Sequence, residues 1–246
     1  MIPNPIRKVL SSMREHQVQC LLMGGQACVL YGAAEFSRDT DLAILASEEN
    51  AERLTKAMQA LEAEVIAVPP FLLQHLDAGH AVHFRCRHPE AAGMRVDVMS
   101  RMRGVTDFPR LWERRTTLEM DDGTLCDLLS LGDLVQAKKT QRDKDWPMIR
   151  RLVEANYFAN LADPSPEQLN FWFKEFRTPE LLRDLAQAHP ALAKDAVATR
   201  ALIQCAVSDD VPALTLSLED EERQERLEDR AYWQPLKQEL ERLRRQ

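Results

Sequence analysis

Two aspartates separated by one residue are the side chains of this sequence best suited to metal and phosphate chemistry. Asp39 and Asp41 lead into the apolar segment 42–45, and residues i and i+2 of an extended chain project from the same face. Carboxylates this close repel each other, which raises the pKa of one of them unless a cation sits between them. Oxygen ligands of this kind suit Mg²⁺ or Mn²⁺, particularly where substrate phosphates complete the coordination. A solvated loop whose aspartate caps a helix is the structural alternative.

A third aspartate, Asp97, lies in the middle of an alternating segment, residues 94–99. The alternation puts Asp97 and Arg95 on one face and the two flanking valines on the other. A carboxylate in a half-buried strand is costly unless it is paired or bound to metal. Its partner is therefore either a metal ion or a neighbouring arginine, Arg95 or Arg85.

A pair of glycines, Gly24-Gly25, separates the apolar segment 20–23 from an apolar helix expected over residues 26–31. Adjacent glycines let the backbone approach phosphate oxygens closely, and a helix N-terminus offers unpaired N–H groups. A tight turn would explain the pair equally well. The surrounding residues lack the G-x-x-x-x-G-K-[ST] pattern, which disfavours an ATPase of the P-loop class.

The elements that must position these residues follow from hydrophobic spacing and turn residues. We expect helices over 3–16, 26–31, 48–62, 133–142 and 146–156, and strands over 20–23, 41–45, 64–68, 80–87 and 94–99. A hairpin over 116–127 would turn at Asp121-Asp122-Gly123. After residue 163 only helical patterns remain, over 166–176, 179–188, 190–206 and 218–245. This predicts an α+β domain over residues 1–160 and an all-helical domain over 161–246.

Composition and charge limit the classes of protein to which the chain can belong. The chain has 246 residues, 45% of them hydrophobic, and a formal net charge of −7, which is ordinary for a globular protein and argues against a general nucleic-acid coat. Its five scattered cysteines, without CxxC pairing, indicate reduced thiols in the core. With no apolar leader and no membrane-spanning run, we expect a cytoplasmic protein. Its four tryptophans lie at apolar helical spacing and are expected in the core.

One stretch is basic. From His83 to Arg115 there are eight arginines against four acids. These arginines would suit an anionic acceptor such as RNA. Alternatively, they serve only to neutralise pyrophosphate and Asp97. The nearby His80, His83, Cys86 and His88 do not match the spacing of a closed zinc site, and we expect no structural zinc there. His83 is a candidate for substrate contact.

Taken together, the order GG, then S-x-D-x-D-L, then a single strand aspartate resembles the nucleotidyltransferase superfamily, the polymerase-beta-like fold. Residues 22–45, LMGGQACVLYGAAEFSRDTDLAIL, carry most of the resemblance, which is strongest to the minimal bacterial nucleotidyltransferases that include toxins of toxin–antitoxin pairs. Residues 129–145 resemble the helix of those proteins whose Lys and Arg reach the triphosphate. The resemblance covers about the first 155 residues, and it implies a mixed β-sheet flanked by helices.

The resemblance also implies roles for individual residues. Asp39, Asp41 and Asp97 would ligate Mg²⁺ or Mn²⁺, with Asp97 also acting as base toward the attacking hydroxyl. Asp145 would orient a lysine or cap the following helix, and we expect the cap. The nucleotide would be bound by Gly24, Gly25, Ser37, Lys138, Lys139 and Arg142.

The function that follows is transfer of an NMP from an NTP to a hydroxyl acceptor with release of pyrophosphate. The acceptor can be RNA, a protein or a small molecule, and we favour RNA or a protein. The alternative is a protein of the same fold that binds nucleotide or a partner without turnover.

Overall fold

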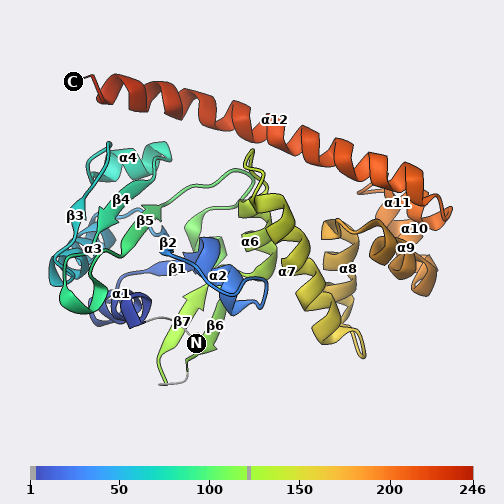
Figure 1. Ribbon diagram of the computed structural model, residues 1–246, viewed down its shortest axis with the longest axis horizontal. Helices are drawn as coiled ribbons and strands as arrows, with labels where there is room; N and C mark the ends of the chain where they lie inside the picture. Colours follow the sequence, from blue (N-terminus) through green and yellow to red (C-terminus); the bar gives the residue numbers. More distant parts are fainter. Residues whose placement is uncertain (1–3, 121–122, 246) are drawn as a thin grey trace. The chain divides into compact units, whose positions relative to one another are not determined.

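The computed structural model describes residues 4–120 and 123–245, which form two compact units (Figure 1). The first unit comprises residues 1–30, 34–137 and 232–246, and the second comprises residues 31–33 and 138–231. Compact units need not be independently folding domains, so the division into 1–160 and 161–246 stays a prediction.

All the described strands belong to one mixed sheet in the first unit. The strands are β1 (Cys20–Met23), β2 (Asp39–Ile44), β3 (Glu64–Val65), β4 (Val82–Arg85), β5 (Arg95–Met99), β6 (Thr116–Glu119) and β7 (Leu125–Leu128). Their order across the sheet is β3-β4-β5-β2-β1-β7-β6. The pairs β2–β5 and β1–β7 are parallel and the other neighbours are antiparallel.

Strands β4 and β5 alternate between a buried face and a more exposed face, as the sequence predicts for residues 94–99, whereas β1 and β2 each bury successive residues. Leu22, Leu42, Val98 and Val82 are neighbours in register across four strands, and each is fully buried or nearly so. Because side chains of a strand alternate between faces, the residues next to this row point to the opposite face, where Asp41, Asp97 and His83 are partly exposed and Leu21 and Ala43 are buried.

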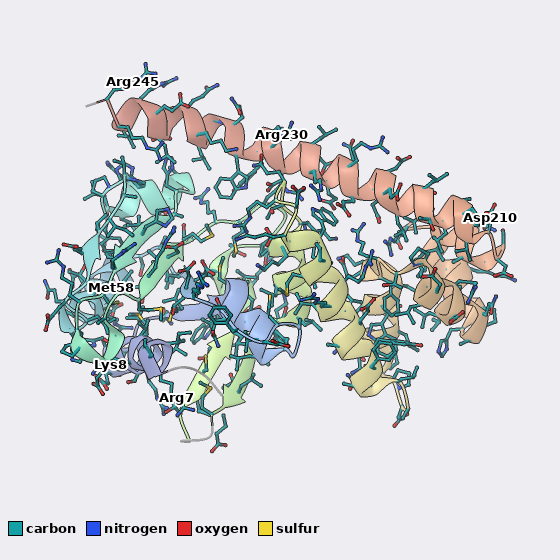
Figure 2. The ribbon with its side chains drawn as sticks, in the orientation of Figure 1. Arg7, Lys8, Met58, Asp210, Arg230 and Arg245 are labelled. Atoms are coloured by element: carbon teal, nitrogen blue, oxygen red, sulfur yellow. The ribbon has the colours of Figure 1, made fainter. Side chains whose placement is uncertain are left out.

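Helices of the first unit supply the rest of its core. They are α1 (Asn4–Glu15), α2 (Gly24–Leu30), α3 (Glu48–Ala60), α4 (Leu73–Ala78), the 3₁₀ turn η1 (Pro89–Ala91), α5 (Phe108–Glu113) and α6 (Leu131–Lys138), which ends at the unit boundary. Met58 of α3, labelled in Figure 2, is buried. The buried Ser12 hydroxyl of α1 donates to the carbonyl of Ala57 at 3.1 Å, which joins α1 to α3.

The second unit has only helices among the regular secondary-structure elements of its described residues. It contains α7 (Asp145–Asn160), α8 (Pro166–Glu175), α9 (Pro179–Ala188), α10 (Pro190–Val197), α11 (Ile203–Val207) and most of α12 (Val211–Leu243), whose end from residue 232 belongs to the first unit. Its core holds Trp172, Phe173 and Phe176, and the Tyr157 ring lies edge-on to Trp172 and Phe176. Asp210, labelled in Figure 2, accepts a hydrogen bond from the Ala213 N–H and so caps α12.

The fold class is confirmed as α+β, with a seven-stranded mixed sheet, flanking helices and a helical C-terminal part. Several helices and strands begin or end at other residues than the sequence predicts. β2 begins at Asp39 rather than 41, because its first residues pair with β5. The short helices α4 and α5 were not expected, and α12 starts earlier than residue 218.

The helix expected over 190–206 is divided between α10 and α11. Between them the buried Arg200 donates to the carbonyls of Phe173 and Phe176, both at 2.9 Å. In the expected hairpin, β6 and β7 pair, whereas Asp121 and Asp122 lie outside the described residues, as does residue 3.

Two expectations from composition can be compared with the structure. Trp146 and Trp172 are buried as expected, whereas Trp112 and Trp233 are only partly buried, so the expectation is wrong for those two. No disulfide links the cysteines of the described ranges. Burial raises the pKa of Cys86 to about 11. Across residues 4–120 and 123–245, no helix carries an apolar stretch long enough to cross a bilayer.

Candidate functional site

The three predicted aspartates lie together on the half-exposed face of the sheet. Asp41 and Asp97 are register partners on the adjacent parallel strands β2 and β5, and Asp39 is two residues before Asp41 on the same face. All three are partly exposed, while Thr40 between the first two is buried. Neighbouring strands are about 4.8 Å apart, so the three carboxyl groups share one area of the sheet surface.

The glycine pair packs directly against this face. Gly24 has a φ of 65°, and a Cβ added to it would lie 1.8 Å from Asp41 Oδ2. A Cβ on Gly25 would lie 2.6 Å from the Ser37 hydroxyl oxygen. Both positions therefore need glycine because the backbone passes beneath these polar side chains. The structure brings Gly24, Gly25, Ser37 and Asp41 together, as the sequence predicts.

Asp97 is held by two cationic or polar neighbours. Arg95 Nε donates to Asp97 Oδ1 at 2.7 Å, and His83 Nδ1 lies 2.8 Å from the same oxygen. Burial tends to raise the pKa of Asp97, but the hydrogen bonds from His83 and Arg95 outweigh it and the pKa is lowered. Asp97 is therefore ionised at neutral pH. Its second oxygen, Oδ2, takes part in neither contact.

Arg95 is the central cation of this face. It is the register partner of Asp39 on one side and of Arg85 on the other. Its pKa is raised first by the hydrogen bond to Asp97 and also by the charges of Asp97, Asp39 and Asp41, against an opposing effect of burial. The sequence suggested Arg95 as a structural partner of Asp97, and the structure confirms that contact.

The predicted triphosphate-binding cations belong to the second unit. Lys138 Nζ lies 3.2 Å from Asp145 Oδ1, and Arg142 Nε lies 2.7 Å from Asp145 Oδ2. Lys139 is buried, with Nζ 2.8 Å from Glu175 Oε2. Each of these cations thus has an acidic neighbour in its own unit, and its role toward a nucleotide stays a prediction.

The expectation that Asp145 caps a helix is wrong. α7 begins at Asp145 itself, and its capping position is Lys144, whose side chain makes no cap hydrogen bond. The Asp145 carboxylate instead contacts Lys138, Arg142 and Thr140. Burial tends to raise the pKa of Asp145, but the charge of Lys138, the Thr140 hydroxyl and Arg142 lower it overall.

Much of the basic stretch is already paired. At least five of its eight arginines contact acids in the first unit: Arg87 with Glu64, Arg95 with Asp97, Arg110 with Asp107, Arg114 with Asp133, and Arg115 with Asp127. The Arg115 guanidinium also lies 4.2 Å from the centre of the Trp112 ring. The charge available to an anionic acceptor is therefore smaller than the sequence count suggests. Arg85 and Arg101 are exposed.

The three aspartates offer oxygen donors of the kind that a hard divalent cation binds, but their carboxylate oxygens do not all lie within 4.8 Å of one another, so binding of one ion would require side-chain rotation. Three carboxylates on one accessible face supply the oxygen ligands that Mg²⁺ and Mn²⁺ prefer. The nearby guanidinium of Arg95 offsets part of their charge, as shown by its hydrogen bond to Asp97. A surface hollow of about 660 Å³ lies at a different place, lined in part by Lys8, Glu90 and Cys126, and does not bear on this face.

Comparison of the whole chain with protein-family models and with curated proteins found no match.

Proposed function

We propose that the first unit is a metal-dependent nucleotidyltransferase of the polymerase-beta-like fold, which moves an NMP from an NTP to a hydroxyl acceptor. The observation that carries the proposal is the register of Asp41 with Asp97, which gathers three carboxylates on one accessible face. The close approach of the glycine backbone to Asp41 and Ser37 supports it independently. A purely structural role would not require both features at the same place.

In this proposal Asp39, Asp41 and Asp97 would hold Mg²⁺, which supplies charge neutralisation at the attacking and leaving oxygens. The acceptor oxygen forms a bond to the α-phosphorus, the bond from that phosphorus to the bridging oxygen breaks, and pyrophosphate leaves. Ser37 and the glycine backbone bind phosphate oxygens, and Arg95 offsets negative charge beside them.

The proton of the acceptor hydroxyl needs a base on this face. The lowered pKa of Asp97 keeps it ionised but makes it a weak base. His83 lies 2.8 Å from Asp97 and has a second ring nitrogen to receive a proton. We therefore assign the proton to His83, oriented by Asp97, in place of the role that the family resemblance implies for Asp97 alone.

One observation favours the alternative of nucleotide binding without turnover. Asp97 already forms an ion pair with Arg95, and an aspartate committed to an arginine is less available to a metal ion. In that case nucleotide would bind through the glycine backbone and Arg95, and no transfer would follow.

Label transfer separates the two functions. The purified chain is incubated with each α-³²P-labelled NTP, Mg²⁺, and either total RNA or lysate protein. The proposal predicts transfer that Asp39→Asn abolishes and that Glu52→Gln, an exposed carboxylate change on α3, leaves intact. Metal-dependent binding of NTP without label on any acceptor would establish the alternative, and loss of both would refute the proposal.

For the acceptor, we propose RNA ahead of protein because the exposed arginines of the basic stretch include Arg85, the register partner of Arg95, and Arg101, which follows β5. Retention on tRNA should weaken with salt, and Arg85→Glu with Arg101→Glu should lower the log–log salt slope by about 1.4, since each lost phosphate contact on a single strand removes about 0.7. The matched pair Arg14→Glu with Lys56→Glu, also exposed, should leave the slope unchanged. Retention that does not depend on salt would exclude RNA.

A further inference from the structure

Two buried histidines flank the turn that ends α4. His75 lies in the helix, and Gly79 ends it with a left-handed φ of 99°. The His80 N–H donates to the His75 carbonyl at 2.9 Å and the Gly79 N–H to the Leu76 carbonyl at 2.9 Å. This pair of bonds reverses the chain and brings His80 back beside His75. Their ring centres are 6.0 Å apart.

A carboxylate from the end of α12, within the same unit, completes the group. A Cβ on Gly79 would lie 3.6 Å from Leu236 Cδ1 and 3.9 Å from the Tyr232 hydroxyl, so this part of α12 covers the turn. One helical turn further, Glu239 Oε2 lies 3.0 Å from His80 Nε2. Ligand atoms of His75, His80 and Glu239 all lie within 4.8 Å of one another.

Both histidines of this group are buried, and one of their ring nitrogens makes no hydrogen bond. His75 is 7% exposed and His80 is 1% exposed. His80 Nε2 is buried and, despite its short distance to Glu239, no acceptor or donor meets it with hydrogen-bond geometry. A buried ring nitrogen without a partner costs free energy, which a ligand bound at that nitrogen would recover.

We propose that His75, His80 and Glu239 bind a divalent transition-metal ion, Zn²⁺ by the chemistry of the donors. Two neutral imidazoles and one carboxylate form a common three-residue zinc set, which leaves a fourth position for water. Ligand atoms about 2.1 Å from the ion at tetrahedral angles are about 3.4 Å apart, so small side-chain rotations from the observed spacing suffice. Mg²⁺ is not expected here, because it prefers oxygen ligands.

The bound ion would fasten the last part of α12 to α4. His75 and His80 come from one turn, whereas Glu239 comes from a helix that reaches the first unit only near its end. The spacing of His80, His83, Cys86 and His88 along the chain does not match a closed zinc site. The proximity of Glu239 to His75 and His80 arises from tertiary contacts, so spacing along the chain does not indicate this group.

Zinc titration against a chromophoric chelator tests the site in the full chain. The metal-free protein should bind one Zn²⁺ per chain through this group, and Glu239→Gln should weaken that binding at least about tenfold. Glu241→Gln, an exposed carboxylate change two residues further on α12, serves as the matched control and should bind as the unmodified chain does. Circular dichroism of each variant checks that it is folded.

Zinc X-ray absorption provides a readout besides affinity, and it should show two imidazole ligands that fall to one in His80→Gln. The variant with Asp39, Asp41 and Asp97 all changed to Asn should keep this zinc, which separates the two sites. Equal zinc affinity in Glu239→Gln and Glu241→Gln, or a spectrum without imidazole, would overturn the proposal.

Discussion

Acidic side chains are buried or half-buried in both units, but their charge is compensated differently. In the second unit Asp145 contacts Lys138 and Arg142, and Glu221 accepts hydrogen bonds from Arg177 and Arg200. Each of these two carboxylates therefore contacts two cationic side chains. On the sheet of the first unit, three aspartates share a face whose central cation is Arg95. The charge of the carboxylates in the second unit is balanced by cations of that unit, whereas our proposal has the three sheet aspartates also bind a metal ion.

The largest expected effect is on activity when a sheet aspartate is changed. Asp41→Asn removes a ligand charge, and label transfer should fall at least ~10³-fold, since metal ions supply several kcal/mol of transition-state stabilisation. The free energy of unfolding should change by less than about 1 kcal/mol, because the side chain is accessible. Urea unfolding measures it alongside transfer. A large loss of stability would assign Asp41 to the core.

For the second unit we expect the larger effect of an aspartate change to be on stability. Asp145→Asn leaves Lys138 and Arg142 without their shared carboxylate, and the free energy of unfolding at pH 7 should fall by about 3 kcal/mol. The lowered pKa of Asp145 means that its stabilisation is present above the unfolded value of about 3.9 and is lost as pH falls through the folded value.

Urea unfolding at a series of pH values checks this prediction. The difference between Asp145→Asn and the unmodified chain should shrink below about pH 4. A difference that stays constant down to pH 2 would show that packing, and not ionisation, accounts for the loss.

Gly24→Ala tests the backbone that supports Asp41. The added Cβ would collide with the Asp41 carboxylate in a left-handed backbone conformation, so we expect label transfer to fall about 100-fold and stability by about 1–2 kcal/mol. Gly132→Ala is the control, because a Cβ there meets nothing within 4 Å. It should leave transfer unchanged. Equal behaviour of the two variants would contradict the packing argument.

The smallest effect concerns Arg95. Arg95→Gln removes a hydrogen-bond donor and a charge, so the pKa of Asp97 should rise, and carboxyl-carbon NMR titration reports it directly. Because Arg95 competes with a metal ion for Asp97, Mn²⁺ should bind roughly tenfold more tightly, about 1.4 kcal/mol. Weaker Mn²⁺ binding would indicate that Arg95 organises the aspartates for the metal.

Short-range signals in the sequence predict much of the sheet. Alternation over residues 94–99 correctly separates Asp97 from its valines, and β1 has the predicted bounds and ends at the glycine pair. Register follows from pairing between distant segments, so the resemblance could place Asp97 on a strand beside Asp39 and Asp41 but could not give its alignment with Asp41.

Other features depend on contacts that leave no local signal. The partners of Asp145 lie within seven residues of it, yet a helix-cap pattern and an ion-pair pattern look alike in sequence. Glu239 approaches His80 only because α12 covers the turn after α4. The two short helices α4 and α5, of six residues each, are too brief for helical periodicity to identify.

Electron paramagnetic resonance of Mn²⁺ tests the central claim most directly, with a non-hydrolysable NTP analogue present. We expect the unmodified chain and Glu52→Gln to bind Mn²⁺ in a manner that the nucleotide strengthens, and Asp41→Asn and Asp97→Asn to lose that binding. Equal Mn²⁺ binding in all four proteins, or none in the unmodified chain, would contradict a metal site on the three aspartates.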